Sequence, residues 1–175
     1  SSWGVFIGFE FYNLFLSWIP GAIGIGLRRV FLPFLLQSSK GGLVVGTGVG
    51  LRVPGRVNLG RGVVLDDHSL VDVRVAADSP ADVGIEIGDR VFVGRFSAIC
   101  SKYGRVKLGN GCNIGSFSRI ATQSSIDIGE SVLISSYVYI GAGNHLAGDI
   151  DRPIIEQGMD IKGGVVIGAN SWIGA

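Results

Sequence analysis

Cysteine and histidine are scarce in this chain, and their scarcity excludes several kinds of site. The chain has two cysteines, Cys100 and Cys112, and two histidines, His68 and His145. With no CxxC motif and no set of Cys and His ligands, neither a disulfide framework nor a zinc site is expected, and the two thiols are interpreted as reduced. His68, which follows Asp66 and Asp67, is interpreted as a solvated corner residue and not as a metal ligand.

Net charge is also nearly absent. The formal charge is +1, and there is no stripe of basic and aromatic residues, so we expect no nucleic-acid partner. Acids are rare in the first part of the chain, where Glu10 alone stands against six Lys and Arg before Asp66. From Asp66 onward the acids outnumber the bases, thirteen to nine. The basic part therefore coincides with the apolar N-terminal segment.

Uninterrupted apolar runs of membrane-spanning length are missing. The run from Trp3 to Ile19 has about 17 residues and contains Glu10, whereas a spanning helix needs ~20 apolar residues. No basic region precedes it and no small-residue cleavage site is clear, so it does not resemble a signal peptide.

Residues 1–38 are instead predicted to form a separate apolar helical segment. We expect two short helices joined at Pro20 and Gly21, the second kinked or ended near Pro33. Residues 3–37 suit a membrane interface, where Arg28 and Arg29 would contact anionic headgroups. The alternative is a helical hairpin that packs on its own domain or on a neighbouring subunit.

Glycine, in contrast, is abundant, at 29 of 175 residues against the ~7% that is typical, and it follows a period. From Gly41 an aliphatic residue recurs every six positions, often with glycine after it. We call these aliphatic residues anchors. The anchors are Val45, Leu51, Leu59, Leu65, Val71, Ile87, Val93, Ile99, Leu108, Ile114, Ile120, Ile128, Ile134, Ile140, Ile167 and Ile173.

This period predicts a solenoid. Three short strands joined by tight turns would form one triangular coil of about 18 residues, and stacked coils would bury the anchor and the residue four positions later. The glycine suits a corner that is crowded or that needs an unusual φ. Breaks in the period predict loops at Ala76–Val83, Ser101–Arg105 and Gly141–Gly164, of which the last is the largest.

The hexapeptide repeat from about Gly41 to Ala175 resembles the left-handed β-helix acyltransferases. The stretches Gly141–His145, Arg152–Ile154 and Ile167–Gly174 resemble the branch of maltose, galactoside and streptogramin O-acetyltransferases. Pro153–Gly158 and the N-terminal segment are most similar to members that modify bacterial polysaccharides or glycolipids.

The resemblance implies an all-β solenoid, a left-handed parallel β-helix over residues 39–175. It also implies a homotrimer with active sites between subunits, where the long loop of one subunit meets the coils of the next. Family members continue with further coils that bind coenzyme A, so the domain is expected to be truncated at Ala175.

The implied function is acetyl-CoA-dependent transfer of an acetyl group to a hydroxyl of a bacterial saccharide or glycolipid, as in polysaccharide biosynthesis. His145 would be the general base, since an imidazole with a pKa near ~6.5 is available in its neutral form. By register Asn144 falls at an inward position, and His145 lies at the corner where the long loop leaves. The implied residues for acetyl-CoA are Gly141, Gly143, Trp172 and Gly174. The candidates for the acceptor are Asn144, Tyr139, Asp149, Asp151, Arg152 and Glu156.

Two alternatives to this function stay open. The solenoid could be a non-catalytic trimeric scaffold, or an N-acyltransferase that acts on an amino-sugar. The acceptor-binding Asn that such sugar acetyltransferases carry is replaced here by Gly115. The expected location is cytoplasmic, peripheral on the inner face of a bacterial membrane.

Overall fold

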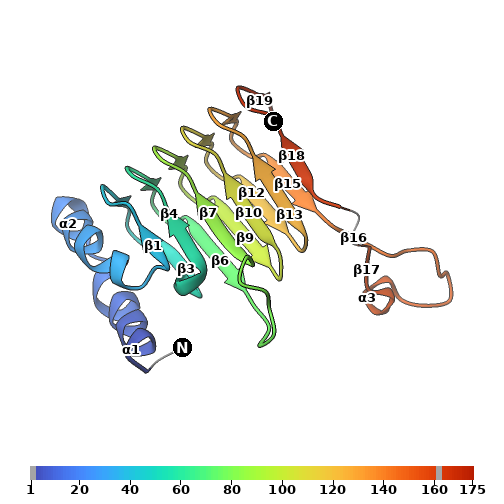
Figure 1. The fold of residues 1–175 in the computed structure, drawn as a ribbon, viewed down its shortest axis with the longest axis horizontal. Coiled ribbons are helices and arrows are strands. Elements are labelled where there is room, and N and C mark those ends of the chain that lie inside the picture. The colour runs from blue at the N-terminus through green and yellow to red at the C-terminus, as the bar shows by residue number, and fades with distance from the viewer. Residues whose placement is uncertain (1–2, 161–162) are drawn as a thin grey trace.

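The computed structural model describes residues 3–160 and 163–175. Coils stack in chain order along one axis, with the N-terminal helices at one end and the C-terminus at the other (Figure 1). A long loop that carries β16, α3 and β17 projects from the C-terminal end of the stack (Figure 1).

Each of the first five coils contributes one short strand to each of three sheets, and residues 163–175 add one strand to sheet A and one to sheet B. Sheet A contains β1 (Ser38–Ser39), β4 (Val57–Leu59), β7 (Gly84–Ile87), β10 (Arg105–Leu108), β13 (Ser125–Ile128) and β18 (Val165–Ile167). Sheet B contains β2 (Val44–Val45), β5 (Val64–Leu65), β8 (Phe92–Val93), β11 (Asn113–Ile114), β14 (Leu133–Ile134) and β19 (Trp172–Ile173). Sheet C contains β3 (Gly50–Arg52), β6 (Leu70–Arg74), β9 (Ala98–Lys102), β12 (Arg119–Thr122) and β15 (Tyr139–Ala142). Strands pair in parallel within all three sheets, which confirms the predicted left-handed parallel β-helix.

The predicted coil length of about 18 residues is wrong. Ile114 pairs with Ile134, and Val93 pairs with Ile114, so an uninterrupted coil holds 20 or 21 residues. The additional residues lie at the corner between sheets C and A, where the chain needs two or three more residues than at the other corners. The three predicted loops also fall at this corner, but Ser101 and Lys102 belong to β9 and Arg105 to β10, so the second is only the turn at Tyr103 and Gly104. Residues 161–162 of the third predicted loop lie outside the described residues.

The interior is a column of stacked side chains. The anchors of the coils before the long loop are buried. The residue four positions later is also buried, as predicted, after the anchors of sheets A and B, but not after those of sheet C, where Tyr103 is exposed and Ser124 is half-buried. Two serines at these positions donate to a carbonyl of the next coil, Ser97 Oγ to Gly115 O (2.8 Å) and Ser118 Oγ to Ser135 O (2.9 Å), whereas the buried Ser69 Oγ has no partner among the described residues. The first two hydroxyls therefore add hydrogen bonds along the stack.

Crowding, and not an unusual φ, explains the glycine after the anchor. A Cβ at Gly60 would lie 2.4 Å from the carbonyl carbon of Gly88, and a Cβ at Gly115 would lie 2.4 Å from the amide nitrogen of Ser136. Neither glycine has a positive φ. These positions therefore let the backbones of successive coils approach each other closely.

Positive φ occurs two residues later, at both of the six-residue corners. Side chains occupy many of these positions, and at the corner between sheets B and C four of them stack. His68 lies 5.0 Å from Phe96, Phe96 lies 5.1 Å from Phe117, and Phe117 lies 5.1 Å from Tyr137, all measured between ring centroids. We call these four residues the aromatic ladder. His68 is thus an exposed corner residue, as predicted, but it also begins this ladder.

The N-terminal segment forms the two predicted helices. Helix α1 (Trp3–Phe11) continues into a π-helical turn, Tyr12–Leu16, and α2 (Gly21–Phe31) begins after Pro20. A 3₁₀ turn, Leu32–Phe34, ends the second helix at Pro33, and another, Pro54–Arg56, follows β3. The inner face of this hairpin packs on the first coil, through side chains such as Leu16, Leu32 and Leu35.

Arg28 closes the open end of the stack, and the prediction that it contacts lipid is wrong. The side chain is completely buried, and its Nε donates to Val45 O (2.9 Å) in the first coil. Its Nη1 donates to Leu16 O (2.9 Å) and Ile19 O (2.7 Å). Tyr12 Oη donates to Val49 O (3.0 Å) in the same coil, and burial raises the pKa of this phenol to about 12.

The outer face of the hairpin is apolar and exposed. Its exposed side chains are Trp3, Phe6, Ile7, Phe11, Leu14, Phe15, Trp18, Ile23, Leu27, Val30 and Phe34. Arg29 is also exposed. Within residues 3–160 and 163–175, no helix has the length and apolar character needed to cross a membrane.

The long loop between β15 and β18 forms a small structure of its own. Strand β16 (Asn144–His145) pairs antiparallel with β17 (Met159–Asp160), and α3 (Ile154–Gln157) lies between them. Asn144 is exposed, so its predicted inward position is wrong. The chain leaves the coil after Ala142, and the inward and outward alternation ends there.

Replacing Arg28 by Gln should destabilise the fold by about 3 kcal/mol or more. The change removes charged donors from three buried carbonyls, and charged hydrogen bonds contribute about 1.5–3 kcal/mol each. Urea unfolding measures the effect, and Arg29→Gln, an exposed neighbour, is the control. Equal stability of the two variants would show that Arg28 does not hold the hairpin to the first coil.

Replacing Gly115 by Ala should also destabilise the fold, because the added methyl group meets the next coil's backbone. We expect a cost of about 1–3 kcal/mol, typical of an overpacked core. Gly55→Ala is the matched control, since its Cβ would meet nothing within 4 Å and its φ is not positive. Matching thermal midpoints for the two variants would contradict the crowding argument.

Candidate functional site

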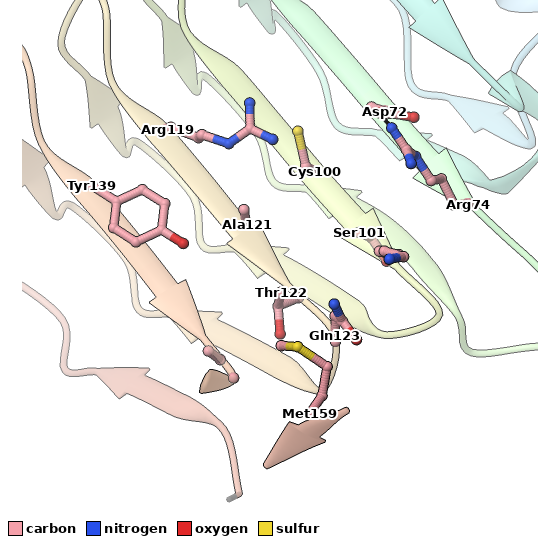
Figure 2. A pocket seen from close by; sticks show the side chains of 13 residues that line it. Asp72, Arg74, Cys100, Ser101, Arg119, Ala121, Thr122, Gln123, Tyr139 and Met159 are labelled. Atoms are coloured by element: carbon pink, nitrogen blue, oxygen red, sulfur yellow. Dashed lines mark ion pairs between the residues drawn. The ribbon is translucent and has the colours of Figure 1, made fainter. Parts of the chain in front are cut away.

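A polar pocket of about 220 Å³ lies on the outer face of sheet C (Figure 2). It is lined by Asp72, Arg74, Cys100, Ser101, Lys102, Arg119, Ala121, Thr122, Gln123, Tyr139, Ala142, Gly143 and Met159. The lining residues come from four successive coils and from the start and end of the long loop. These residues are far apart in the sequence, and they come together because the coils stack.

Strand register places the lining residues in rows. One row across sheet C joins Arg52, Asp72, Cys100, Ala121 and Gly141. Neighbours in a row come from adjacent strands, about 4.8 Å apart. Because Cys100, Ala121 and Gly141 have small side chains, this row forms a low floor between the larger side chains on either side.

Asp72 stands at one end of the floor. Its side chain is only 7% exposed although it points away from the interior column, and its Oδ2 lies 3.5 Å from Arg74 and 3.8 Å from Arg52. Its Oδ1 is buried and accepts no hydrogen bond from the residues that the structure describes. A buried carboxylate oxygen without a donor costs free energy.

Cys100 follows Asp72 in the row and is buried and free. Burial raises the pKa of its thiol, and the nearby Arg119 guanidinium opposes this shift only in part. The sulfur is therefore a neutral thiol near neutral pH. A neutral, buried thiol suits a floor position and not a nucleophile.

His145 lies beside the pocket and does not line it. Its partner in the β16–β17 ribbon is Met159, which does line the pocket. Side chains directly opposite each other in an antiparallel pair project from the same face of the ribbon. His145 is exposed, and its backbone N–H is held by Asn144 Oδ1 (3.0 Å). The imidazole therefore stands free at the rim.

Two of the other predicted residues line the pocket. Tyr139 forms one wall, with its hydroxyl directed over the floor (Figure 2), and Gly143 lies at the exit of β15. Gly141 belongs to the floor row, where an added Cβ would lie 2.5 Å from Tyr139 Oη. The glycine thus leaves room for the tyrosine ring.

Trp172 and Gly174 lie elsewhere. Trp172 is in β19 of sheet B, 73% exposed, and its indole Nε1 donates to Ser135 Oγ (3.2 Å). The pocket is on sheet C, so a single chain does not bring Trp172 to the same surface as Gly141.

The charged candidates of the long loop are exposed and lie outside the pocket. Gln157 ties the loop together, since its Nε2 donates to Asp149 O (2.7 Å) and Arg152 O (2.8 Å). Asp151 N donates to Asp149 Oδ1 (3.0 Å), and Arg152 Nη2 donates to Glu156 O (2.7 Å). These residues shape the loop.

Sequence reasoning missed Asp72, Arg74, Cys100 and Arg119. Each occupies a fixed position relative to an anchor. Arg74 follows its anchor by three residues, as does Lys102, another lining residue. Asp72 and Cys100 follow theirs by one, and Arg119 precedes Ile120 by one. Aligning the third strand of every coil would have gathered them into rows. Among the residues whose placement is described, no group of three or more His, Cys, Asp or Glu could hold a metal ion.

Comparison with known proteins gives one sequence relationship. No protein-family model matches the chain. Among solved structures, a Neisseria gonorrhoeae serine acetyltransferase in complex with serine aligns with 85% of this chain and 53% of that chain, at 16% identity. Its TM-score is 0.25, which is too low to support a conclusion about fold or function.

The sequence relationship is to a Mycobacterium tuberculosis protein named "Probable acetyltransferase". It is 35% identical over 120 residues, which are 69% of this chain and 36% of that protein. This chain therefore spans little more than a third of the length of the relative that it matches. The relationship supports an acyltransferase as the class of protein to which the chain is related.

Proposed function

We propose that the chain is part of an acetyl-CoA-dependent O-acetyltransferase that acts on a hydroxyl of a bacterial saccharide or glycolipid. The observation that carries this proposal is the position of His145, whose free imidazole stands on the β16–β17 ribbon at the rim of the polar pocket. The relationship to a protein named as an acetyltransferase supports the reaction class.

In the proposed reaction, His145 acts as general base. Its neutral imidazole takes the proton from the acceptor hydroxyl as the oxygen attacks the thioester carbonyl. The new C–O bond forms, the C–S bond breaks, and the imidazolium returns the proton to the departing sulfur. No covalent intermediate with the protein is required. Backbone N–H groups near Gly141 and Gly143 are the proposed donors to the developing oxyanion.

A homotrimer would complete this site. Trp172 and Gly174, proposed to bind the acyl donor, follow sheet B, whereas Gly143 and His145 follow sheet C. A neighbouring copy could bring its sheet B to this pocket, which a single chain cannot do. The aromatic ladder, whose Phe96, Phe117 and Tyr137 are exposed, supports a protein contact at the corner between the two sheets.

We also propose that residues 3–37 hold the protein on a membrane surface at the cytoplasmic side. The inner face of the hairpin is already packed on the first coil, and the outer face exposes a broad set of aromatic and aliphatic side chains. An exposed apolar surface of this kind marks a site of interaction. Arg29, which is exposed on α2, would face anionic headgroups.

Replacing His145 by Ala should lower acetyl transfer by about 10²–10⁴-fold, the usual contribution of a general base. Thiol release from acetyl-CoA in the presence of saccharide acceptors measures the rate. The control is Glu86→Ala, an exposed side chain in β7 of sheet A. Unchanged release in His145→Ala would remove this residue from the mechanism.

The same assay separates the alternatives. A wild-type protein that releases no thiol with any saccharide acceptor would favour the non-catalytic scaffold. Release with amino-sugars, but not with their hydroxyl analogues, would favour an N-acyltransferase.

Removing apolar side chains from the outer face of the hairpin should weaken membrane binding. Phe15→Asp combined with Ile23→Asp should reduce binding to anionic vesicles by at least about tenfold, because each exposed side chain contributes about 1.5–3 kcal/mol when buried. Flotation with phosphatidylglycerol vesicles measures it. Val166→Asp, an exposed aliphatic position in β18, is the control. Flotation of the double variant at wild-type levels would contradict membrane docking by this face.

A further inference from the structure

We propose that the pocket on sheet C selects an acidic acceptor, a saccharide that carries a carboxylate or phosphate group beside its hydroxyls. This inference rests on the proposed function and assigns the substrate class of the same site. Three features carry it: an excess of cations, the separation of Arg119 from Asp72, and the size and floor of the pocket.

The first feature is the charge of the lining. Three cations, Arg74, Lys102 and Arg119, face one anion, Asp72. Arg119 and Lys102 make no ion pair with any residue in the part of the chain that the structure describes. Arg74 shares Asp72 with Arg52, so one carboxylate neutralises two guanidinium groups only in part. The lining therefore favours a ligand anion, and guanidinium groups bind carboxylate and phosphate through paired N–H donors.

The second feature is the separation of the charges along the floor. The Asp72 carboxylate is almost fully buried at one end, where its Oδ2 faces Arg52 and Arg74. Arg119 is exposed and stands further along, in the strand next to Tyr139. A ligand anion is repelled by Asp72 and attracted by Arg119, so it would lie at the Arg119 end of the pocket.

The third feature is the shape of the pocket. A volume of about 220 Å³ equals that of about seven waters in the liquid, which suits one sugar unit with its substituent. The floor of Cys100, Ala121 and Gly141 leads from Asp72 toward β15 and the long loop. Arg119 and Tyr139 stand on one side of this floor in adjacent strands (Figure 2). A ring on the floor would thus present a hydroxyl toward the rim where His145 lies.

Calorimetric titration of the purified protein with three probes tests the proposal. Glucuronate carries a carboxylate, glucose 6-phosphate carries a phosphate, and glucose carries neither. We expect at least one of the acidic sugars to bind about tenfold or more tightly than glucose, because charge-assisted hydrogen bonds are the stronger ones. The acidic sugar that binds more tightly identifies the anionic group.

Variants tie the binding to the pocket. Arg119→Gln should weaken binding of the preferred acidic sugar by about tenfold, and this exposed side chain has no ion pair whose loss would disturb the fold. Arg74→Gln should also weaken it, because it removes a second cation of the lining and leaves Asp72 less neutralised. Arg90→Gln, an exposed arginine at the corner between sheets A and B, is the control and should leave binding unchanged.

Equal binding of glucose and both acidic sugars would overturn the proposal. So would the absence of binding at millimolar concentration, or binding that Arg119→Gln and Arg74→Gln leave unaltered. The binding experiment needs no acetyl-CoA. If His145→Ala keeps full activity while acidic sugars still bind, the proposed mechanism fails and the pocket assignment stands. If neutral sugars are acetylated and acidic ones do not bind, the pocket assignment fails alone.

Discussion

Backbone hydrogen bonds join each coil to its neighbours, and the N-terminal end of the stack has no preceding coil to complete them. N–H groups such as those of Val44 and Gly46 donate to carbonyls of the next coil, Val63 O and Leu65 O, whereas residues at the positive-φ corners donate back, as in His68 N to Thr47 O. Carbonyls of the first coil that face away from the second coil need donors from another part of the chain. Arg28 and Tyr12 supply donors to Val45 O and Val49 O from the helical hairpin. A cation with several donors is buried there because buried carbonyls require partners.

The column of the solenoid could be predicted from the sequence, but the surface of sheet C could not. The six-residue period identified the inward anchors and the three loops, and the apolar runs broken at Pro20 and Pro33 identified the hairpin, because each depends on local pattern. The rows of the pocket depend on the length of a whole coil, and that length is set at the corner between sheets C and A. An assumed coil of about 18 residues places Asp72 and Cys100 in the wrong relation to each other. Asn144 was misplaced for a related reason, because the chain leaves the coil immediately before it.

The pocket gathers residues that local pattern does not connect. Asp72, Cys100 and Arg119 come from three coils, and only parallel stacking in register brings them to one face. His145, in contrast, was predicted from its place in a sequence motif, and its role as general base stays a prediction. What the structure adds is its surroundings: it stands opposite Met159, beside a pocket with buried polar groups and cations.

Two corners of every coil keep the six-residue spacing between anchors, whereas the number of residues at the corner between sheets C and A varies from coil to coil. Leu59 follows Leu51 by eight positions, and the long loop separates Ile140 from Ile167. Both neighbouring coils still pair in register across these differences. Chain length is thus free to change along one edge without disturbing the column. That edge is where new segments could be grafted during evolution or by design, each one placed against a ready-made face of sheet C.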